Sequence, residues 1–171
     1  ITDNGFEGRI EPLLCDVRRA KLRPGEEAAD VVFCNPPYLA AQSGFARRHT
    51  ESEIARREIE GGIADFCACA ARLLRSGGYF YACFLPARLT DLLFAMRQNC
   101  IEPKRLTLVY PTEAHRPSLV LAEGKKDAAP SLYVTKPLLM QQRGEDGQLR
   151  DTPQLAYIYR EGAFLQEYEK P

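Results

Sequence analysis

The chain has 171 residues, enough for one domain and too few for two comfortable ones. Its 23 Lys and Arg balance its 23 Asp and Glu, so nucleic-acid binding would have to come from a local patch and not from overall charge. No apolar run approaches the roughly 18 residues of a membrane span. No charged-then-apolar leader is present, so we expect an intracellular, cytoplasmic protein.

Two strands and a helix are predicted in the first half of the chain. The first strand covers Arg9–Cys15, and the second covers Ala29–Cys34. The second strand is almost entirely apolar, which is typical of a strand covered on both faces. After a loop over Leu39–Thr50, apolar residues recur three and four positions apart and predict a helix over Glu51–Leu74. We expect Ser76-Gly77-Gly78 to end this helix, with glycine in the left-handed cap conformation.

The second half of the chain continues the alternation of strands and helices. A buried strand over Tyr79–Leu85 precedes a second helix over Leu89–Asn99. The remaining predicted strands are Arg105–Tyr110, Ser118–Ala122 and Leu132–Thr135. This order predicts an α/β fold with a mainly parallel sheet and an antiparallel strand near the C-terminus. We expect one domain over residues 1–171, with a partly loop-like tail over 141–171 and a short element at Leu155–Tyr159.

The cysteines favour a reduced protein without a metal site. The chain has no C-x-x-C pair, and His49 and His115 are its only histidines, so zinc is not expected. We interpret the thiols as small hydrophobic core residues. The six are Cys15, Cys34, Cys67, Cys69, Cys83 and Cys100.

The stretch "ADVVFCNPPYLAAQSG" carries the clearest chemical signal. Two prolines cannot continue a sheet ladder, because neither has a backbone N–H. Asn35 and Tyr38 should therefore follow the carboxyl end of the strand, which is the edge where open α/β sheets bind ligands. A bare Asn-Pro-Pro is also compatible with an Asx-type turn and a surface tyrosine. Its position after a buried strand in an α/β alternation favours a site.

This residue combination suits a planar amine whose lone pair is delocalised. The side-chain oxygen of Asn35 and the carbonyl of Pro36 can accept hydrogen bonds from both N–H groups, which favours a pyramidal, nucleophilic nitrogen. Pro37 restricts Pro36 to extended geometry and so fixes the direction of that carbonyl. Tyr38 offers a flat face on which a base can stack. Much of the acceleration would come from positioning the amine against an electrophile.

"VVFCNPPY" resembles motif IV, [DNS]-P-P-[YFW], of the S-adenosylmethionine-dependent amino-methyltransferases. The further blocks "ARRE", "DFCACAARLLRSGGYFYACFLPARLTDLL", "PKRLTLVYP" and "HRPSLVLAEGKK" follow in the order of the bacterial tRNA1(Val) adenine-37 N6-methyltransferase group. The resemblance covers roughly residues 4–159. It implies a Rossmann-like class I methyltransferase fold, S-adenosylmethionine as cofactor and an RNA substrate, with tRNA the expected one.

The resemblance also implies roles for single residues. Asn35 and Pro36, with Pro37, would hold the target amine, and Tyr38 would stack on the adenine. Asp16 matches the acid that contacts the adenine amine of the cofactor, and Val17 would line the same pocket, with Asn35 close by. Asp16 could equally be a helix N-cap or a turn residue.

The cofactor loop of the family is not found in this sequence. That loop is a glycine-rich turn followed by an acidic residue that binds the ribose hydroxyls. We therefore expect the chain to be the carboxyl-terminal two-thirds of a longer enzyme, and to be inactive alone. At about 30 residues per βαβ unit, roughly 60 or more residues would precede it. Two central strands would then be missing between the strands at Arg9–Cys15 and Val31–Cys34.

Basic residues suggest a phosphate-binding rim. The candidates for nucleic-acid contact are Arg47, Arg48, Arg56, Arg57, His115 and Arg116, with His49 and Lys125-Lys126 adding charge. Glutamates interleave with the arginines at helical spacing, so a solvated helix face is the alternative. A target adenine in a tRNA loop would have to be splayed out to reach the pocket.

Other functions stay open at this point. A protein glutamine N5-methyltransferase uses the same acceptors on an amide, and a DNA adenine would fit the same pocket. A non-catalytic RNA- or protein-binding remnant is a third alternative. The sequence does not indicate an oligomeric state.

Overall fold

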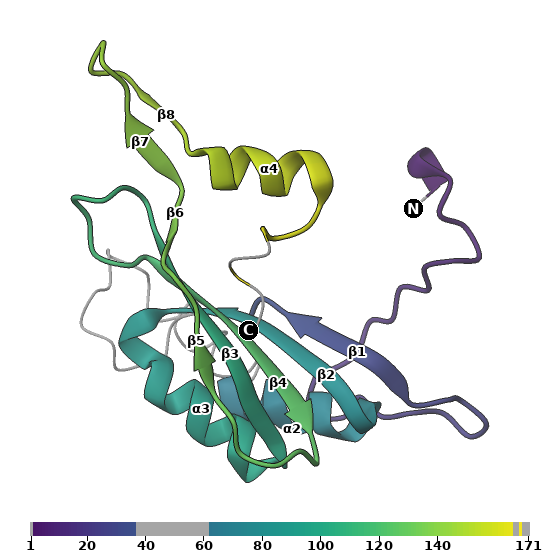
Figure 1. Ribbon diagram of the computed structural model, residues 1–171. Helices are drawn as coiled ribbons and strands as arrows, with labels where there is room; N and C mark the ends of the chain where they lie inside the picture. Colours follow the sequence, from purple (N-terminus) through teal and green to yellow (C-terminus); the bar gives the residue numbers. More distant parts are fainter. Residues whose placement is uncertain (1, 37–61, 166–167, 169–171) are drawn as a thin grey trace, which may run out of the picture.

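The computed structural model describes residues 2–36, 62–165 and 168 (Figure 1). The predicted loop at Leu39–Thr50 and the first part of the predicted helix, residues 51–61, lie outside this range. A short 3-10 helix, η1 (Thr2–Asn4), opens the chain. The first residues form an extended arm that leads away from the body.

One mixed sheet forms the body, in the order β1-β2-β4-β3-β5, with β6 also paired to β3. Strand β4 is antiparallel to both of its neighbours, and the other strands of this sheet all run in one direction. This arrangement confirms the α/β class and the mainly parallel sheet. The strands are β1 (Ala29–Cys34), β2 (Leu74–Phe84), β3 (Ile101–Tyr110), β4 (Leu119–Lys126), β5 (Tyr133–Val134) and β6 (Leu138–Leu139).

Two helices cover one face of this sheet (Figure 1). Helix α2 (Ile63–Leu73) leads into β2, and α3 (Leu89–Gln98) follows the 3-10 turn η2 (Pro86–Arg88). The buried core lies between these helices and β2, β3 and β4, so alternate strand residues point into it. Its fully buried members include Cys67, Phe80, Phe84, Leu92, Met96, Ile101 and Val120.

The helix layer lies close to β4 because a glycine faces it. A Cβ on Gly124 would lie 2.6 Å from Ile101 Cγ2 and closer still to Met96 Cε. The next residue on this side, Lys126, donates from Nζ to the carbonyls of Ala71 (2.6 Å) and Leu74 (2.8 Å). A lysine thus satisfies carbonyls at the end of α2, where helices leave them unpaired.

The predicted glycine cap of α2 is wrong in position. The helix ends at Leu73, and Leu74 already has extended backbone angles and begins β2. Ser76–Gly78 lie within β2, where the pairing to β1 jumps from Leu74 to Tyr79. Gly77 has the expected positive φ of 75°, but uses it in this irregular part of the strand. The cap is unnecessary here because Lys126 binds the helix end.

Within the described residues, Ala29–Cys34 is covered on one face only, which differs from the expected covering of both faces. The strand exists with the predicted bounds, but it lies at the edge of the described sheet. Phe33 is 82% exposed and Val31 is 48% exposed. Their side chains lie on the face that α2 and α3 leave uncovered. The apolar run alone did not reveal how many layers surround the strand.

The predicted strand at Arg9–Cys15 is absent. These residues form a turn and irregular backbone, and Leu13 and Leu14 are largely exposed. A strand needs a neighbouring backbone for its hydrogen bonds, and none of the described strands pairs with this segment.

The tail contains more regular structure than its polar composition predicts. Strands β7 (Gln141–Arg143) and β8 (Leu149–Asp151) form a hairpin, and α4 (Pro153–Glu161) replaces the short element predicted at Leu155–Tyr159. Thr152 caps α4 by accepting from the amide of Leu155 at 3.2 Å. Gly162, at φ 65°, ends it.

All six cysteines carry free thiols. Cys67 and Cys69 are buried, as expected of core residues, whereas Cys15 and Cys100 are exposed, which corrects that expectation for those two. Cys15 is exposed because its predicted strand does not form. Within the described part of the chain, no three metal-ligating side chains cluster. None of the helices seen there is long and apolar enough to cross a membrane.

Candidate functional site

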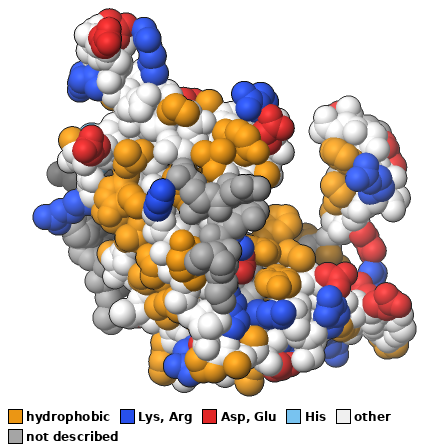
Figure 2. All heavy atoms as spheres, viewed as in Figure 1, with side chains coloured by type: hydrophobic (Ala, Val, Ile, Leu, Met, Phe, Trp, Pro, Cys, Tyr) orange, Lys and Arg blue, Asp and Glu red, His pale blue; other side chains and the backbone are white. Residues whose placement is uncertain are grey.

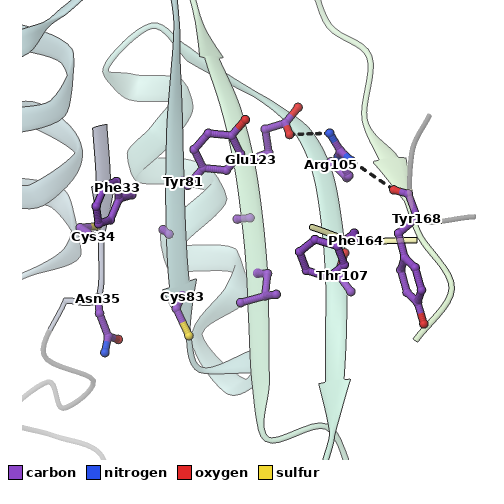
Figure 3. Close-up of a pocket in the computed structure, with 13 residues that line it drawn as sticks. Phe33, Cys34, Asn35, Tyr81, Cys83, Arg105, Thr107, Glu123, Phe164 and Tyr168 are labelled. Atoms are coloured by element: carbon purple, nitrogen blue, oxygen red, sulfur yellow. Dashed lines mark hydrogen bonds and ion pairs between the residues drawn. The ribbon is translucent and has the colours of Figure 1, made fainter. Parts of the chain in front are cut away.

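Asn35 lies at the edge of the sheet where its parallel strands end. It directly follows β1, and β1, β2 and β3 all have their carboxyl ends on this edge. Figure 3 shows Asn35 at the end of β1 next to Cys83 of β2. The position agrees with the prediction and with the general location of ligand sites in open α/β sheets.

Pro36 explains why the strand stops here. It has no backbone N–H to donate, and its side chain is fully buried, which holds the chain against the body at this point. Asn35, by contrast, is exposed. Pro37 and Tyr38, the other two residues of the motif, lie outside the described residues. An exposed amide next to a buried proline gives two acceptors, the Asn35 side-chain oxygen and the Pro36 carbonyl, at the same edge.

A cavity of about 660 Å³ opens beside Asn35, on the face without helices. Aromatic and aliphatic side chains dominate its wall, and a few polar groups converge on it, which is typical of small-molecule sites. Figure 3 shows the arrangement across β1, β2, β4 and β3. The lining residues include Phe33, Cys34, Asn35, Tyr81, Cys83, Arg105, Thr107, Leu121, Glu123, Phe164 and Tyr168.

A hydrogen bond from Arg105 ties Tyr168 of the tail to this cavity. The guanidinium of Arg105 donates to Glu123 Oε2 (2.7 Å) and to the carbonyl of Tyr168 (3.1 Å). Tyr168 is almost fully buried, and its hydroxyl donates to the carbonyl of Pro137 at 3.2 Å. Its ring is 5.7 Å from that of Phe164. These contacts fix one wall of the cavity.

Two titratable groups that line the cavity have raised pKa values. Burial raises the pKa of the Tyr81 phenol, and the nearby Glu123 carboxylate adds to the rise. Burial raises the pKa of the Cys34 thiol to about 12. Both groups are therefore neutral near physiological pH. Thr107 accepts from the Thr135 hydroxyl at 2.8 Å, so it is part of a buried pair.

Asp16 and Val17, the predicted cofactor contacts, lie in a turn beside α2. The Asp16 carboxylate accepts from the backbone N–H and the Nε of Arg18, both at 2.9 Å. These hydrogen bonds lower the pKa of Asp16 to about 2. Arg72 of α2 donates to the carbonyl of Val17 at 2.9 Å. Asp16 therefore acts as a turn residue, and its carboxylate binds the backbone and side chain of Arg18.

The predicted basic rim is only partly described. His115 and Arg116 are exposed in the turn between β3 and β4, on the same edge as Asn35. His115 Nδ1 is 2.6 Å from Thr112 Oγ1. Lys125 and Lys126 lie at the opposite end of β4, paired with Tyr79 and Ile101, so they do not extend this rim. Arg47, Arg48, Arg56 and Arg57, with His49, lie outside the described residues.

Several cavity residues were missed in the sequence. Tyr81 and Cys83 alternate with buried Phe80, Ala82 and Phe84, and this period of two could have separated the two faces of β2. Arg105 and Glu123 meet through strand pairing, and Phe164 and Tyr168 come from the distant tail. For these four, no local signal exists.

No protein-family model matches the chain, and no curated protein matches its sequence. Among solved structures, a predicted O-methyltransferase, Atu636 of Agrobacterium tumefaciens, superposes with a TM-score of 0.68 at 23% identity, over 93% of this chain and 66% of that one. TTHA0409 of Thermus thermophilus, provisionally described as a DNA modification methylase, gives a TM-score of 0.43 at 12% identity, over 69% of this chain and 54% of that one.

The likeness to Atu636 shows the fold. This chain has the Rossmann-like fold of the class I methyltransferases, and it spans just under two thirds of the length of that protein.

Proposed function

We propose that the protein transfers a methyl group from S-adenosylmethionine to the exocyclic N6 amine of adenine in RNA, with tRNA as the expected substrate. The observation that carries this proposal is the position of Asn35 and Pro36. In a class I methyltransferase fold, they follow a parallel strand at the ligand-binding edge of the sheet.

The two acceptors act on the amine itself. The Asn35 side-chain oxygen and the Pro36 carbonyl accept its two N–H groups, turn its lone pair towards the electrophile and stabilise the charge that develops on nitrogen. As the new N–C bond forms, the bond between the methyl group and the sulfonium sulfur would break and leave a neutral thioether, and the nitrogen would lose one proton to water. No strong general base is required, because the positively charged intermediate is far more acidic than the starting amine. Positioning supplies much of the acceleration.

The residues present are compatible with the cofactor. S-adenosylmethionine, when bound, supplies an electrophilic methyl group on sulfur. Asp16 is ionised at neutral pH and can only accept hydrogen bonds, which suits the adenine amine of the cofactor. Its present partner is the guanidinium of the exposed Arg18, and exposed ion pairs contribute little stability. Arg18 can therefore give way to a ligand at small cost.

RNA is favoured over a peptide by the basic residues at the same edge. His115 and Arg116 are exposed beside the carboxyl ends of the strands, where they can contact phosphates. Stacking on Tyr38, positioning by Pro37 and phosphate contacts by the four arginines at 47, 48, 56 and 57 remain part of the proposal. A cytoplasmic location would agree with this substrate.

The test uses the complete gene product that contains these 171 residues. It is incubated with labelled S-adenosylmethionine and, in separate reactions, with bulk unmodified tRNA, single-stranded DNA and a glutamine-containing peptide. Digestion of the RNA to nucleosides should yield labelled N6-methyladenosine. Label in the peptide alone would identify a glutamine methyltransferase, and label in DNA alone a DNA enzyme. Label in none of them would favour a non-catalytic binding module.

A further inference from the structure

Arg88 follows the carboxyl end of β2, on the edge of the sheet that carries Asn35. It is the last residue of η2 and the N-cap of α3, so it belongs to the face that the helices cover. Figure 2 shows Lys and Arg side chains on the surface of the molecule, where they are usually found. The side chain of Arg88, by contrast, is only 21% exposed. Burying most of a charged group is costly, so its presence at this edge needs a physical reason.

The chemistry of the helix terminus does not explain an arginine at this position. N-caps favour Ser, Thr, Asp and Asn, and the Arg88 side chain makes no cap hydrogen bond to α3. The N-terminus of a helix also carries partial positive charge, which disfavours a cation. Asp91, in the first turn of α3, offsets that charge by accepting from Arg88 Nε at 2.9 Å. A polar cap residue would suit the helix better, which points to a role outside the helix.

The guanidinium of Arg88 lies over an aromatic ring of the core. Its Cζ is 5.4 Å from the centre of the Phe84 ring, within the range of a cation–π contact. Phe84 is completely buried and is the last residue of β2. Such a contact is stronger when it is shielded from water. Arg88 therefore restrains the last core ring before the ligand-binding edge.

Strand register places Pro36 next to this ring. Cys34 pairs with Ala82 in the parallel ladder of β1 and β2, so Pro36, two residues further along, is level with Phe84. Exposed and less exposed residues alternate from β1 through Asn35 and Pro36, so Pro36 points to the same side of the sheet as Phe84. Adjacent strands lie about 4.8 Å apart. The two fully buried side chains are therefore neighbours where the strands end.

The position of Pro36 decides where two acceptors point. Its carbonyl and the side-chain oxygen of Asn35 are the groups that would hold the target amine. We propose that Arg88 is a positioning residue for methyl transfer, which holds Phe84 against Pro36 and thereby fixes the direction of both acceptors. This inference rests on the proposed function, and it adds a residue that acts through its neighbours. Asp91 balances the charge of Arg88, which favours an amine that becomes positively charged during transfer.

The experiment measures the single-turnover rate of methyl transfer to unmodified tRNA by the complete protein, together with the dissociation constants of tRNA and S-adenosylmethionine. Arg88→Met keeps a long apolar side chain and removes the cation. We expect the rate to fall about 10- to 100-fold, because a displacement of about 1 Å at the reacting atoms can have an effect of that size. Both dissociation constants should stay nearly unchanged. Arg88→Lys keeps a cation over the ring and should recover part of the rate.

The matched control is Arg160→Met on α4. Arg160 also lies over a ring, 5.6 Å from the centre of that of Tyr157, and also forms an ion pair, with Glu161 at 2.6 Å. The rate of this variant should equal that of the wild type. If a melting scan shows that Arg88→Met is unfolded, Arg88→Gln serves, because it keeps a donor for Asp91 and removes the charge.

A double-mutant cycle tests whether Arg88 acts through the ring. Phe84→Leu removes the ring, and in this background Arg88→Met should cause little further loss of rate. A loss of the same size in both backgrounds would overturn the proposal. So would a wild-type rate in folded Arg88→Met. Weaker binding of tRNA at an unchanged rate would overturn it as well, since Arg88 would then contact the RNA.

Failure of this inference can be told from failure of the proposed function. Labelled N6-methyladenosine formed at the same rate by the wild type and Arg88→Met overturns the role of Arg88 and leaves the function intact. Label in DNA or in a glutamine-containing peptide alone contradicts RNA as the substrate. The same rate comparison with that acceptor then supports Arg88 if the rate falls and overturns it if the rate is unchanged. Label in no acceptor overturns both proposals.

Discussion

The two faces of the sheet differ although the same strands form both. On one face Phe80 and Phe84 are completely buried under α2 and α3, together with the small Ala82 between them. On the other, Tyr81 is 39% exposed and Phe33 is 82% exposed, and a cavity runs beside them towards Asn35. Alternate residues of one strand therefore face the core and the cavity, so each face can be tested by its own substitution.

Truncating one aromatic residue on each face should give the largest difference in the free energy of unfolding between the two faces. Phe80→Ala removes a fully buried ring from the core and should lower the free energy of unfolding by about 3–5 kcal/mol. Phe33→Ala, on the adjacent strand, should change it by less than about 0.5 kcal/mol. Urea denaturation of the two variants measures both values. Equal losses would mean that the helix-free face is as tightly packed as the other.

Adding one methyl group to β4, on the face that the helices cover, should change the free energy of unfolding by a smaller amount. Gly124→Ala places a Cβ against Met96 and Ile101 and should lower the free energy of unfolding by about 1–3 kcal/mol. Similar urea midpoints for Gly124→Ala and the wild type would show that α3 can move away from β4.

The reaction of the cysteine thiols with a disulfide reagent should show the smallest of the three effects. It reports directly on how buried each thiol is. Burial raises the pKa of both Cys34 and Cys67 to about 12. The buried Cys67 should react with a disulfide reagent at about pH 8 only on unfolding, the half-buried Cys34 should react slowly, and Cys15 and Cys100 should react at once. Since the folded-state pKa values lie above the ordinary 9.0, the two thiols stabilise the fold below about pH 9, and this stabilisation is lost as the pH rises towards 12.

Rapid labelling of all the thiols in the folded protein would contradict the burial of Cys67 and Cys69. Mass mapping after a short reaction assigns the modified residues. Loss of stability that begins well below pH 9 would contradict the raised pKa values, because neither thiol would then be held neutral by the fold.

The sequence predicted those elements whose signals are local. The apolar runs placed β1 and β3, and three-and-four spacing placed α3 within one residue of its ends. Asn-Pro-Pro placed Asn35 at the carboxyl edge of the sheet. Thr152, Pro153 and Gly162 also formed a complete set of helix boundary signals for α4, although the polar composition of the tail favoured a loop.

Other features depend on partners that are distant in the sequence. Leu13 and Leu14 resemble strand residues, but no described strand lies beside them. The exposure of Phe33 follows from the order of the strands and from the side on which the helices pack. Arg105 reaches Tyr168 across 63 residues, a contact that no local pattern indicates.

The most direct test of the central claim compares the wild type with Asn35→Ala in the complete protein. The measurement is the yield of labelled N6-methyladenosine in tRNA, together with the dissociation constant of S-adenosylmethionine. Asn4→Ala, the same change on the exposed arm, is the control and should behave as the wild type. The account predicts that Asn35→Ala lowers transfer by about 100- to 1,000-fold, with cofactor affinity nearly unchanged. Turnover near that of the wild type would contradict the role of Asn35 as the acceptor that holds the amine.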